Sequence, residues 1–326
     1  MNRPHSVRPF EPKHLPLPCR SILRPKPVLG CRALYDQWGI GVTICLASTT
    51  VNGPFVTVSD KRITWGEGGT PADDEGTLKN AMIAKHWGMM FSTDNMHPVA
   101  KLYEDVRRRL EPQKNTLNQT IVRSAVEAAY RAAFEERFVG ERLSRYGFRS
   151  MEQFRNEGMD VFGPALMEKF SKEIDNYYLG STISLSLLIY GFDSPPPLGW
   201  QHIFIVENPG VAQDCDMFGY AIIGSGHAPA LAALLSKRFT KPTLTEAIWR
   251  LCEAKFSAEA AYAVGKETHV ILLKEDGGVV MMLPGPIKKL RELYEKERRA
   301  PIPPEASEAI KSGLKGLIPN IESEGI

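Results

Sequence analysis

Two short runs rich in β-branched residues lie close together in the sequence, with a turn signal between them. The first run is Thr43–Ala47, the second is Phe55–Asp60, and Asn52-Gly53-Pro54 separates them. Runs of this kind around an Asn-Gly pair are typical of a β-hairpin. A threonine begins the first run and an aspartate ends the second, so we expect the hairpin to hold a hydroxyl and a carboxylate at one end.

A lysine precedes the next predicted pair of strands. Lys79 stands directly before strand 80–86, and strand 88–93 follows. If these strands are adjacent to the hairpin, one site collects the ammonium of Lys79, the hydroxyl of Thr43 and the carboxylate of Asp60. Spacing alone indicates no more than hairpins with a charged rim. Lys85 is a poorer candidate, because it stands at the far end of its strand.

The remaining sequence arranges strands and helices in blocks rather than in single alternation. Apolar residues at three- and four-residue spacing predict two helices over 95–135 and two more over 228–256, the last capped by Thr245. The charged stretch 137–180, punctuated by Gly140, Gly147 and Gly158, is expected to be a helical insertion. Further strands are expected at 182–191, 201–206, 220–226, 269–273 and 279–283. This order predicts an α+β fold in which two packed sheets carry helices on both outer sides.

The two ends of the chain differ in composition from its middle. Residues 1–38 contain seven prolines and no periodic pattern, which predicts a disordered or extended segment. Residues 39–285 are expected to form the folded domain, and 286–326 a charged helix with a proline-rich tail. Because residues 1–32 hold seven Lys and Arg against one Glu and the whole chain has a formal net charge of +2, the folded part is mildly acidic. That charge argues against nucleic acid as a partner and leaves only the basic tail to support an RNA- or phosphate-binding module.

Cysteine and histidine usage argues against disulfides and metal sites. The five cysteines are scattered, odd in number and without a CxxC pair, which suits a reducing cytoplasm. His86, His227 and His269 have no ligand spacing, so we expect neither a metal nor another cofactor. No apolar run is long enough to span a bilayer, and the N-terminus lacks the apolar core of a secretory signal. We therefore expect a cytoplasmic protein that does not bind a membrane.

Four blocks of the sequence carry a resemblance to a known family. They are Thr43-Ile44-Cys45-Leu46, Val58–Thr64, Thr77-Leu78-Lys79 with the strand pair behind it, and Tyr220–Gly226. In this order and spacing they resemble the proteasome β-type branch of the N-terminal-nucleophile (Ntn) hydrolases and related bacterial proteasome-like proteins. The resemblance covers about residues 41–278. It implies a four-layer αββα sandwich, a peptide or small amide as substrate, and assembly into a homo-oligomer.

The resemblance also implies roles for five residues. Thr43 would be the nucleophile and, once N-terminal, would use its own α-amine as the general base. Lys79 would lower the pKa of that amine by like-charge repulsion, and Asp60 would pair with Lys79. A backbone N–H near Thr93 would stabilise the oxyanion, and Ser225 would hydrogen-bond the amine. Together these roles describe a threonine hydrolase of amide bonds.

Other positions favour a non-catalytic structural or assembly subunit of the same fold. The family has glycines where Ser92-Thr93-Asp94 stands, and side chains there would crowd a substrate strand. The family also has an aspartate and a serine at the positions of Ala261 and Val264. Glu259 is two residues out of place, which on a helix directs it elsewhere. Thr43 also has a plain explanation as a β-branched residue that opens a strand, so the enzyme and the structural subunit both stay open.

The position of Thr43 within the chain bears on this choice, because a blocked amine cannot act as a base. In the resembling family an initiator methionine stands where this chain has Val42, and no methionine lies between Met1 and Met82. A bacterial GUG codon is read as methionine when it initiates and as valine elsewhere. We therefore expect Val42 to be the true initiator and residues 1–41 to be upstream sequence. The competing explanations are a propeptide, or a tail retained on an inactive subunit.

Overall fold

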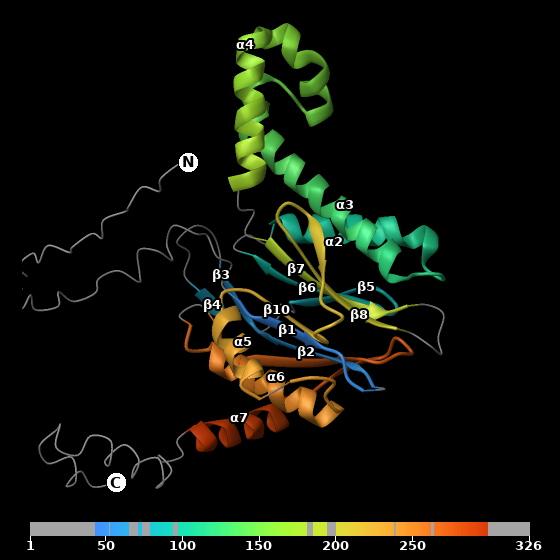
Figure 1. The fold of residues 1–326 in the computed structure, drawn as a ribbon, viewed down its shortest axis with the longest axis vertical. Helices are drawn as coiled ribbons and strands as arrows, with labels where there is room; N and C mark the ends of the chain where they lie inside the picture. The colour runs from blue at the N-terminus through green and yellow to red at the C-terminus, as the bar shows by residue number, and fades with distance from the viewer. Residues whose placement is uncertain are drawn as a thin grey trace, which may run out of the picture. The chain divides into compact units, whose positions relative to one another are not determined.

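The fold is α+β, with two five-stranded antiparallel sheets, a two-stranded ribbon and several helices (Figure 1). The sequence makes predictions for residues 1–38, for Val42 and for the tail after Arg298. These residues lie outside the described part of the chain. The computed structural model describes residues 43–298 except 52, 65–70, 74–78, 94–96, 181–184, 194–199, 238 and 262–263.

The first sheet contains the hairpin that the sequence predicts. Its strand order is β10-β1-β2-β11-β12, and every neighbouring pair is antiparallel. In the hairpin Cys45 pairs with Ser59, which brings the start of β1 and the end of β2 together. The strands are β1 (Cys45–Ser48), β2 (Phe55–Asp60), β10 (Tyr220–Ile223), β11 (Thr268–Leu273) and β12 (Val279–Met281).

The second sheet has the order β5-β6-β7-β8-β9 and is also antiparallel throughout. Its strands are β5 (Asn80–Ala84), β6 (Trp87–Thr93), β7 (Leu185–Phe192), β8 (Gln201–Glu207) and β9 (Val211–Asp214). The sequence predicts neither β9 nor the small ribbon of β3 (Arg62–Thr64) and β4 (Pro71–Asp73). These segments hold three or four residues each, too few to show the alternation of apolar side chains that marks a strand.

Helices lie on the outer side of each sheet (Figure 1). Each sheet shares an apolar core with its helices. Helices α2 (His97–Leu110) and α3 (Gln119–Phe138) pack with the second sheet, and their buried residues join Trp87 and Met89 of β6. Helices α5, α6 and α7 pack with the first sheet. Their bounds are His227–Leu235 for α5, Leu244–Ala258 for α6 and Pro284–Arg298 for α7.

The cap of α6 differs from the prediction. Thr243 is the N-cap rather than Thr245, and it forms a capping box in which its side chain accepts from the N–H of Glu246 while Glu246 accepts from the N–H of Thr243. A glutamate three residues after the threonine makes this reciprocal pair. Only Thr243 has that partner, because Ile248 follows Thr245 at the same spacing.

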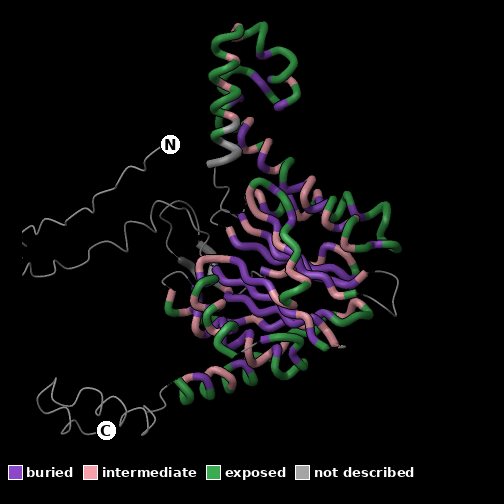
Figure 2. The backbone as a smooth tube through the Cα atoms, in the orientation of Figure 1, coloured by how far each residue is buried: buried purple, intermediate pink, exposed green. Residues whose placement is uncertain are grey.

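A third apolar cluster lies between the two sheets. Cys45 and Phe55 of the first sheet meet Met90, Leu188 and Tyr190 of the second, and all five are buried. The strands accordingly form the most buried part of the chain, whereas the helices expose their outer faces (Figure 2). Because the sheets face each other, side chains at the strand ends of one sheet can reach those of the other.

The predicted insertion at 137–180 is helical and has a small core of its own. It comprises a π-helical turn at Val139–Leu143, a 3₁₀ turn at Ser144–Tyr146 and the helix α4 at Met151–Gly180. Five buried residues form the core: Phe138, Leu143, Phe148, Met151 and Phe154. Gly147 does end a helical turn, whereas Gly140 and Gly158, also predicted as breaks, lie inside helical segments. The interruption of α4 is instead at Gly163, before Pro164, which lacks the N–H that a continuous helix needs.

Candidate active site

The structure brings Thr43, Asp60 and Lys79 together at one rim between the sheets. Thr43 lies just before β1, Asp60 ends β2 and Lys79 directly precedes β5. Their exposed fractions are 2%, 0% and 3%. The sequence predicts a site on adjacent strands, and this detail is wrong for Lys79, which comes from the facing sheet. The packing of the two sheets therefore brings Lys79 to Thr43 and Asp60.

The three side chains form a closed triangle of hydrogen bonds. Thr43 Oγ1 donates to Asp60 Oδ1 at 2.6 Å, and Lys79 Nζ donates to the same oxygen at 2.6 Å. Lys79 Nζ also donates to Thr43 Oγ1. A cationic donor on a hydroxyl oxygen stabilises the negative charge that this oxygen acquires when it loses its proton or attacks a carbonyl. The arrangement is thus suited to activating Thr43 as a nucleophile.

Both oxygens of the Asp60 carboxylate are held by backbone donors as well. Oδ1 accepts from the N–H of Ile44 at 3.1 Å, and Oδ2 accepts from the N–H of Gly265 at 2.9 Å. A buried carboxylate is costly unless charge and hydrogen bonds compensate for lost water. Asp60 has both kinds of compensation, so its orientation toward Thr43 and Lys79 is closely defined.

Ser225, the fourth predicted residue, lies beside the backbone of Thr43. The N–H of Thr43 donates to Ser225 Oγ at 3.3 Å, and Ser225 Oγ lies 3.3 Å from the Thr43 carbonyl oxygen, to which it donates. Gly224 makes this approach possible, because a Cβ at that position would lie 2.2 Å from the Thr43 carbonyl oxygen. Its φ of +105° also favours glycine.

Thr93 and Lys85 are placed on the second sheet. Thr93 is the last residue of β6 and pairs with Leu185 of β7. Its role as an oxyanion donor stays a prediction, and its neighbour Asp94 lies outside the described residues. Lys85 is exposed at the turn after β5, which agrees with the choice of Lys79 over Lys85.

The residues behind Asp60 were missed by the sequence reasoning. Gly265 donates to Asp60, and the fully buried Lys255 donates to the Gly265 carbonyl at 2.9 Å. One signal in the sequence could have found Lys255, because it falls on the apolar stripe of α6 four residues after Leu251. Glu259 does not take the place of the aspartate of the resembling family, because its carboxylate binds Lys255 and Arg291. Where that family has an aspartate and a serine, this chain has Ala261, which packs against an apolar cluster, and Val264, which is buried in it.

A cysteine close to the triangle is buried, and its surroundings disfavour the thiolate. Cys45 Sγ donates to the Phe91 carbonyl at 3.4 Å and has no exposed surface. Burial, the largest influence, raises the pKa of the thiol to about 12, even though the charge of Lys79 opposes the shift. A thiol in this state is not a nucleophile near neutral pH. The hydroxyl of Thr43 is the stronger candidate.

A buried histidine outside this site is held between two carboxylates. His202 Nδ1 lies 2.6 Å from Asp216 Oδ2, and Nε2 lies 3.3 Å from Asp193 Oδ2. The indole of Trp87 stacks on the imidazole with ring centroids 6.2 Å apart. Burial by itself lowers the pKa of His202, but the hydrogen bond and charge of Asp216, joined by Asp193, outweigh burial and raise it. Nδ1 is hydrogen-bonded to Asp216, whereas Nε2 has only the charge contact with Asp193 and no hydrogen bond, and none of these groups belongs to the Thr43 triangle.

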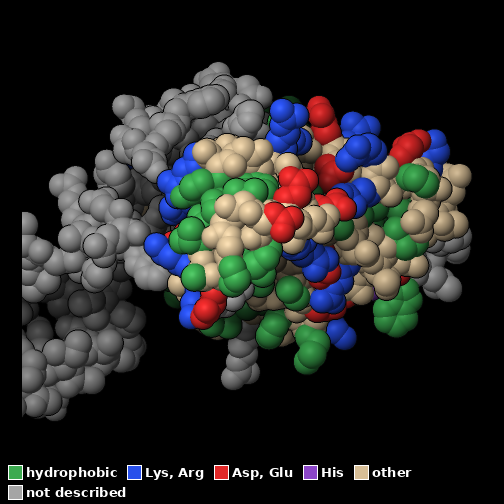
Figure 3. Space-filling model, turned by 90° about the horizontal axis from the view of Figure 1, so that it is seen from above, with side chains coloured by type: hydrophobic (Ala, Val, Ile, Leu, Met, Phe, Trp, Pro, Cys, Tyr) green, Lys and Arg blue, Asp and Glu red, His purple; other side chains and the backbone are tan. Residues whose placement is uncertain are grey.

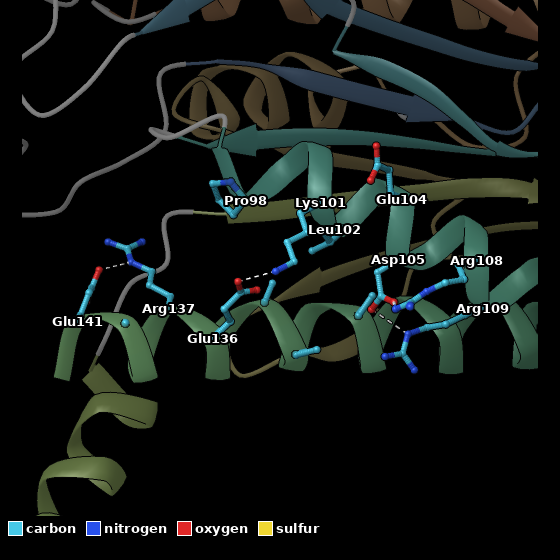
Figure 4. A pocket seen from close by; sticks show the side chains of 14 residues that line it. Pro98, Lys101, Leu102, Glu104, Asp105, Arg108, Arg109, Glu136, Arg137 and Glu141 are labelled. Atoms are coloured by element: carbon cyan, nitrogen blue, oxygen red, sulfur yellow. Dashed lines mark hydrogen bonds and ion pairs between the residues drawn. The ribbon is translucent and has the colours of Figure 1, made fainter. Parts of the chain in front are cut away.

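A surface groove of about 740 Å³ lies between α2 and α3 (Figure 4). Its floor includes Leu102 and alanines of α3, and its walls carry ion pairs such as Lys101–Glu136 and Arg109–Asp105. Its lining contains no hydroxyl, thiol or imidazole group. The groove shares no residue with the Thr43 triangle, and its Lys and Arg side chains Lys101 and Arg109 are held in surface ion pairs, so we do not choose it as the candidate catalytic centre.

Two further findings concern metals and membranes. Within the described ranges, no group of three or more His, Cys, Asp or Glu side chains is arranged to hold a metal ion. In the same part of the chain, no helix has both the length and the apolarity needed to cross a bilayer.

On the face shown in Figure 3, Lys and Arg side chains are interspersed with Asp and Glu rather than gathered into one basic area.

Neither the scan against protein-family models nor the search of curated proteins finds a match to this chain.

Proposed function

We propose that this chain is a proteasome-like Ntn hydrolase in which Thr43 attacks amide bonds of peptides or small amides. The observation that carries the proposal is the buried triangle of Thr43, Asp60 and Lys79. Apolar side chains of similar volume would stabilise the fold about as well as a buried ion pair. The stability of the fold therefore does not explain why Asp60 and Lys79 are buried together around the hydroxyl of Thr43. The two sheets pack face to face, and each packs against helices through a shared apolar cluster. This arrangement also fits the four-layer αββα sandwich of that family.

In the proposed reaction Thr43 Oγ attacks the carbonyl carbon of the substrate, and the hydroxyl proton passes to the free α-amine of Thr43. Lys79 stabilises charge on Oγ, Asp60 keeps Lys79 in place, and a backbone N–H near Thr93 holds the oxyanion. The C–N bond then breaks, and the leaving amine takes the proton from the α-ammonium. Water hydrolyses the ester left on Thr43, again with the α-amine as base, and this step releases the acid and restores the hydroxyl.

The proposed mechanism requires a free amine at Thr43. In the structure the backbone nitrogen of Thr43 lies 3.3 Å from Ser225 Oγ, so an amine at the same position stays within reach of that hydroxyl. A peptide bond at this nitrogen removes its basicity and abolishes the reaction. Initiation at Val42 with loss of the initiator, or removal of a propeptide, would each supply the amine.

The test compares two forms of the protein, one beginning at Thr43 and one with the full chain. Each is treated with a β-lactone, an electrophile that acylates a nucleophilic hydroxyl, and the adduct is located by mass spectrometry. We expect one adduct, on Thr43, in the first form only. Thr43→Ser should retain labelling, whereas Thr43→Val and Lys79→Met should lose it.

Thr57→Val is the matched control, because Thr57 is a buried threonine of β2 whose hydroxyl donates to the Ile271 carbonyl at 3.1 Å. It should label like the unsubstituted chain. Absence of any adduct on the form that begins at Thr43, or equal labelling of Thr43→Val, would refute the hydrolase proposal.

A non-catalytic subunit of the same fold is the second candidate. The observation in its favour is that Val264 is a buried member of an apolar core cluster and that Ala261 packs against the same cluster. The resemblance places an aspartate and a serine that orient the amine at these two positions. This candidate predicts that the mature protein from the native organism retains residues before Thr43, which the mass of its N-terminal peptide decides.

We also propose that the protein is a cytoplasmic homo-oligomer, because the proteasome-like proteins that its sequence resembles assemble into rings. The helical insertion at 137–180 and the charged helix α7 are additional elements available for contacts between copies. Light scattering at micromolar concentration should give a multiple of the chain mass. A clean monomer mass would contradict this proposal.

A further inference from the structure

A second buried cation lies on the Oδ2 side of Asp60. Lys255 of α6 has no exposed surface, and its ammonium donates to Glu259 Oε1 at 2.5 Å, to the Gly265 carbonyl at 2.9 Å and to the Lys266 carbonyl at 2.8 Å. An ammonium has three protons to donate, so each has an acceptor. Lysine is almost never fully buried without such partners.

Arg291 of α7 binds both Glu259 and the backbone carbonyl of Lys266, one of the two carbonyls that Lys255 holds. Arg291 donates to both oxygens of Glu259, at 2.6 and 2.7 Å, and its Nη2 donates to the Lys266 carbonyl at 2.5 Å. The guanidinium also lies 4.3 Å from the centre of the Phe256 ring. The backbone at residues 265–266 is therefore held by cations from two helices.

This segment connects Lys255 to the candidate active site. The residue whose carbonyl Lys255 holds, Gly265, donates its own N–H to Asp60 Oδ2 at 2.9 Å. The other carboxylate oxygen accepts from Thr43, Lys79 and Ile44. With a donor on each oxygen, the carboxylate cannot rotate without losing a hydrogen bond.

We propose that Lys255 is a positioning residue that fixes Gly265 and, through its N–H, the orientation of Asp60 toward Thr43 and Lys79. Glu259 and Arg291 support Lys255 in this role. The catalytic consequence rests on the proposed function above, whereas the structural link from Lys255 to Asp60 does not.

A buried ammonium is an expensive way to fill this space. Burial, the largest influence, lowers the pKa of Lys255 to about 8, while the charge and hydrogen bond of Glu259 oppose the shift. A methionine would fill a similar volume without that desolvation cost, but it would leave two carbonyls and one carboxylate oxygen without this donor. The hydrogen bonds that the ammonium donates therefore explain why this buried position holds a lysine rather than an apolar residue.

The first arm of the test measures hydrogen exchange at the Gly265 amide and needs no activity. Lys255→Met should raise the exchange rate about tenfold or more, because Gly265 loses the contact that holds it against Asp60. The matched control is Lys237→Met. Lys237 lies after α5 and pairs at 3.6 Å with Glu253 of α6, the helix that carries Lys255, and the Lys237 side chain is 44% exposed. Unchanged protection of Gly265 in Lys255→Met would overturn the proposal.

A second variant keeps this arm decisive if Lys255→Met fails to fold. Arg291→Met removes the outer contact with the Lys266 carbonyl from a side chain that is 27% exposed, so it is the milder change. It should raise exchange at Gly265 in the same direction and by a smaller factor. No change at Gly265 in a folded Arg291→Met protein would count against the link.

The second arm measures acylation by the β-lactone in the form that begins at Thr43. Lys255→Met should lower the rate constant of the bond-forming step about 10- to 100-fold, as expected when a reacting group is misplaced by about 1 Å, and should leave the reversible affinity for the probe unchanged. A purely structural defect would weaken affinity or reduce the active fraction without changing that rate constant. If the unsubstituted chain is not acylated at all, the hydrolase proposal fails, and the exchange arm still decides whether Lys255 positions Asp60.

Discussion

Replacing Lys79 by methionine tests whether the triangle is as buried as the structure indicates. The substitution removes the cation and keeps most of the side-chain volume, so the Asp60 carboxylate stays at 0% exposure with only neutral donors. Removing one partner of a buried pair costs about 3–5 kcal/mol of unfolding free energy, because the remaining charge stays desolvated and uncompensated. We expect Lys79→Met to fall in that range.

The chain offers a control of nearly equal geometry. Lys101 and Glu136 form an ion pair at 2.5 Å, against 2.6 Å for Lys79 and Asp60, but their side chains are 68% and 58% exposed. Exposed pairs contribute about 0–1 kcal/mol, because water solvates each charge after the other is removed. Lys101→Met should therefore change the unfolding free energy little, and the difference between the two variants isolates the effect of burial.

The assay is urea unfolding of the full chain, followed by two spectroscopic probes to check that the transitions coincide. A lower midpoint at unchanged slope identifies a true loss of stability. The double variant Asp60→Asn/Lys79→Met should be less destabilised than the sum of the two single variants, because each single variant leaves one buried charge without its partner and the double variant leaves none. If Lys79→Met costs no more than Lys101→Met, the buried ion pair, and with it the physical basis of the candidate site, is refuted.

Three further predictions concern single residues. The pKa of His202 is raised in the folded chain, so protonation of His202 adds stability. This contribution is complete below the unfolded pKa of 6.5 and is lost as pH rises through the folded pKa. The difference in melting temperature between the unsubstituted chain and His202→Gln should therefore shrink as pH increases across that window, and a constant difference would contradict the prediction. Cys45, with its pKa raised to about 12, should resist thiol reagents near neutral pH until the chain unfolds, and rapid modification of the native protein would show that it is not buried. Gly224→Ala should cost more than about 1 kcal/mol, because φ is +105° and the new Cβ would lie 2.2 Å from the Thr43 carbonyl, whereas Gly285→Ala, with open space at its Cβ, should be close to neutral in the same urea titration.

Local sequence patterns predicted those elements whose signal is local. The hairpin of β1 and β2 follows from two β-branched runs and an Asn-Gly turn, and Asp60 ends its strand as expected. The same patterns do not reveal β9, because a four-residue strand is too short to show a period, and they place the cap of α6 at Thr245, whereas Glu246 makes Thr243 the cap. The glycines at 140 and 158 were predicted as breaks, yet helical hydrogen bonding continues through them.

The candidate site divides in the same way. Thr43, Asp60, Lys79 and Ser225 could be singled out from residue types, order and a family resemblance, without knowledge of their distances. Only the tertiary structure shows that Lys79 reaches Asp60 from the opposite sheet, because the facing of two sheets depends on the cluster of apolar side chains between them. No spacing rule in the sequence describes such packing.

Gly265 shows most clearly what the sequence could not determine. It lies 205 residues from Asp60, and it donates its N–H there because β2 and β11 are neighbours and because Lys255 and Arg291 hold the segment just before β11. The sequence determined strands, helices and the residues able to do chemistry, since these follow from side-chain type and short-range periodicity. Which of those residues meet was decided by burial: the apolar faces of two sheets and three helices had to pack together, and only that packing brought the buried charges within hydrogen-bond distance of one another.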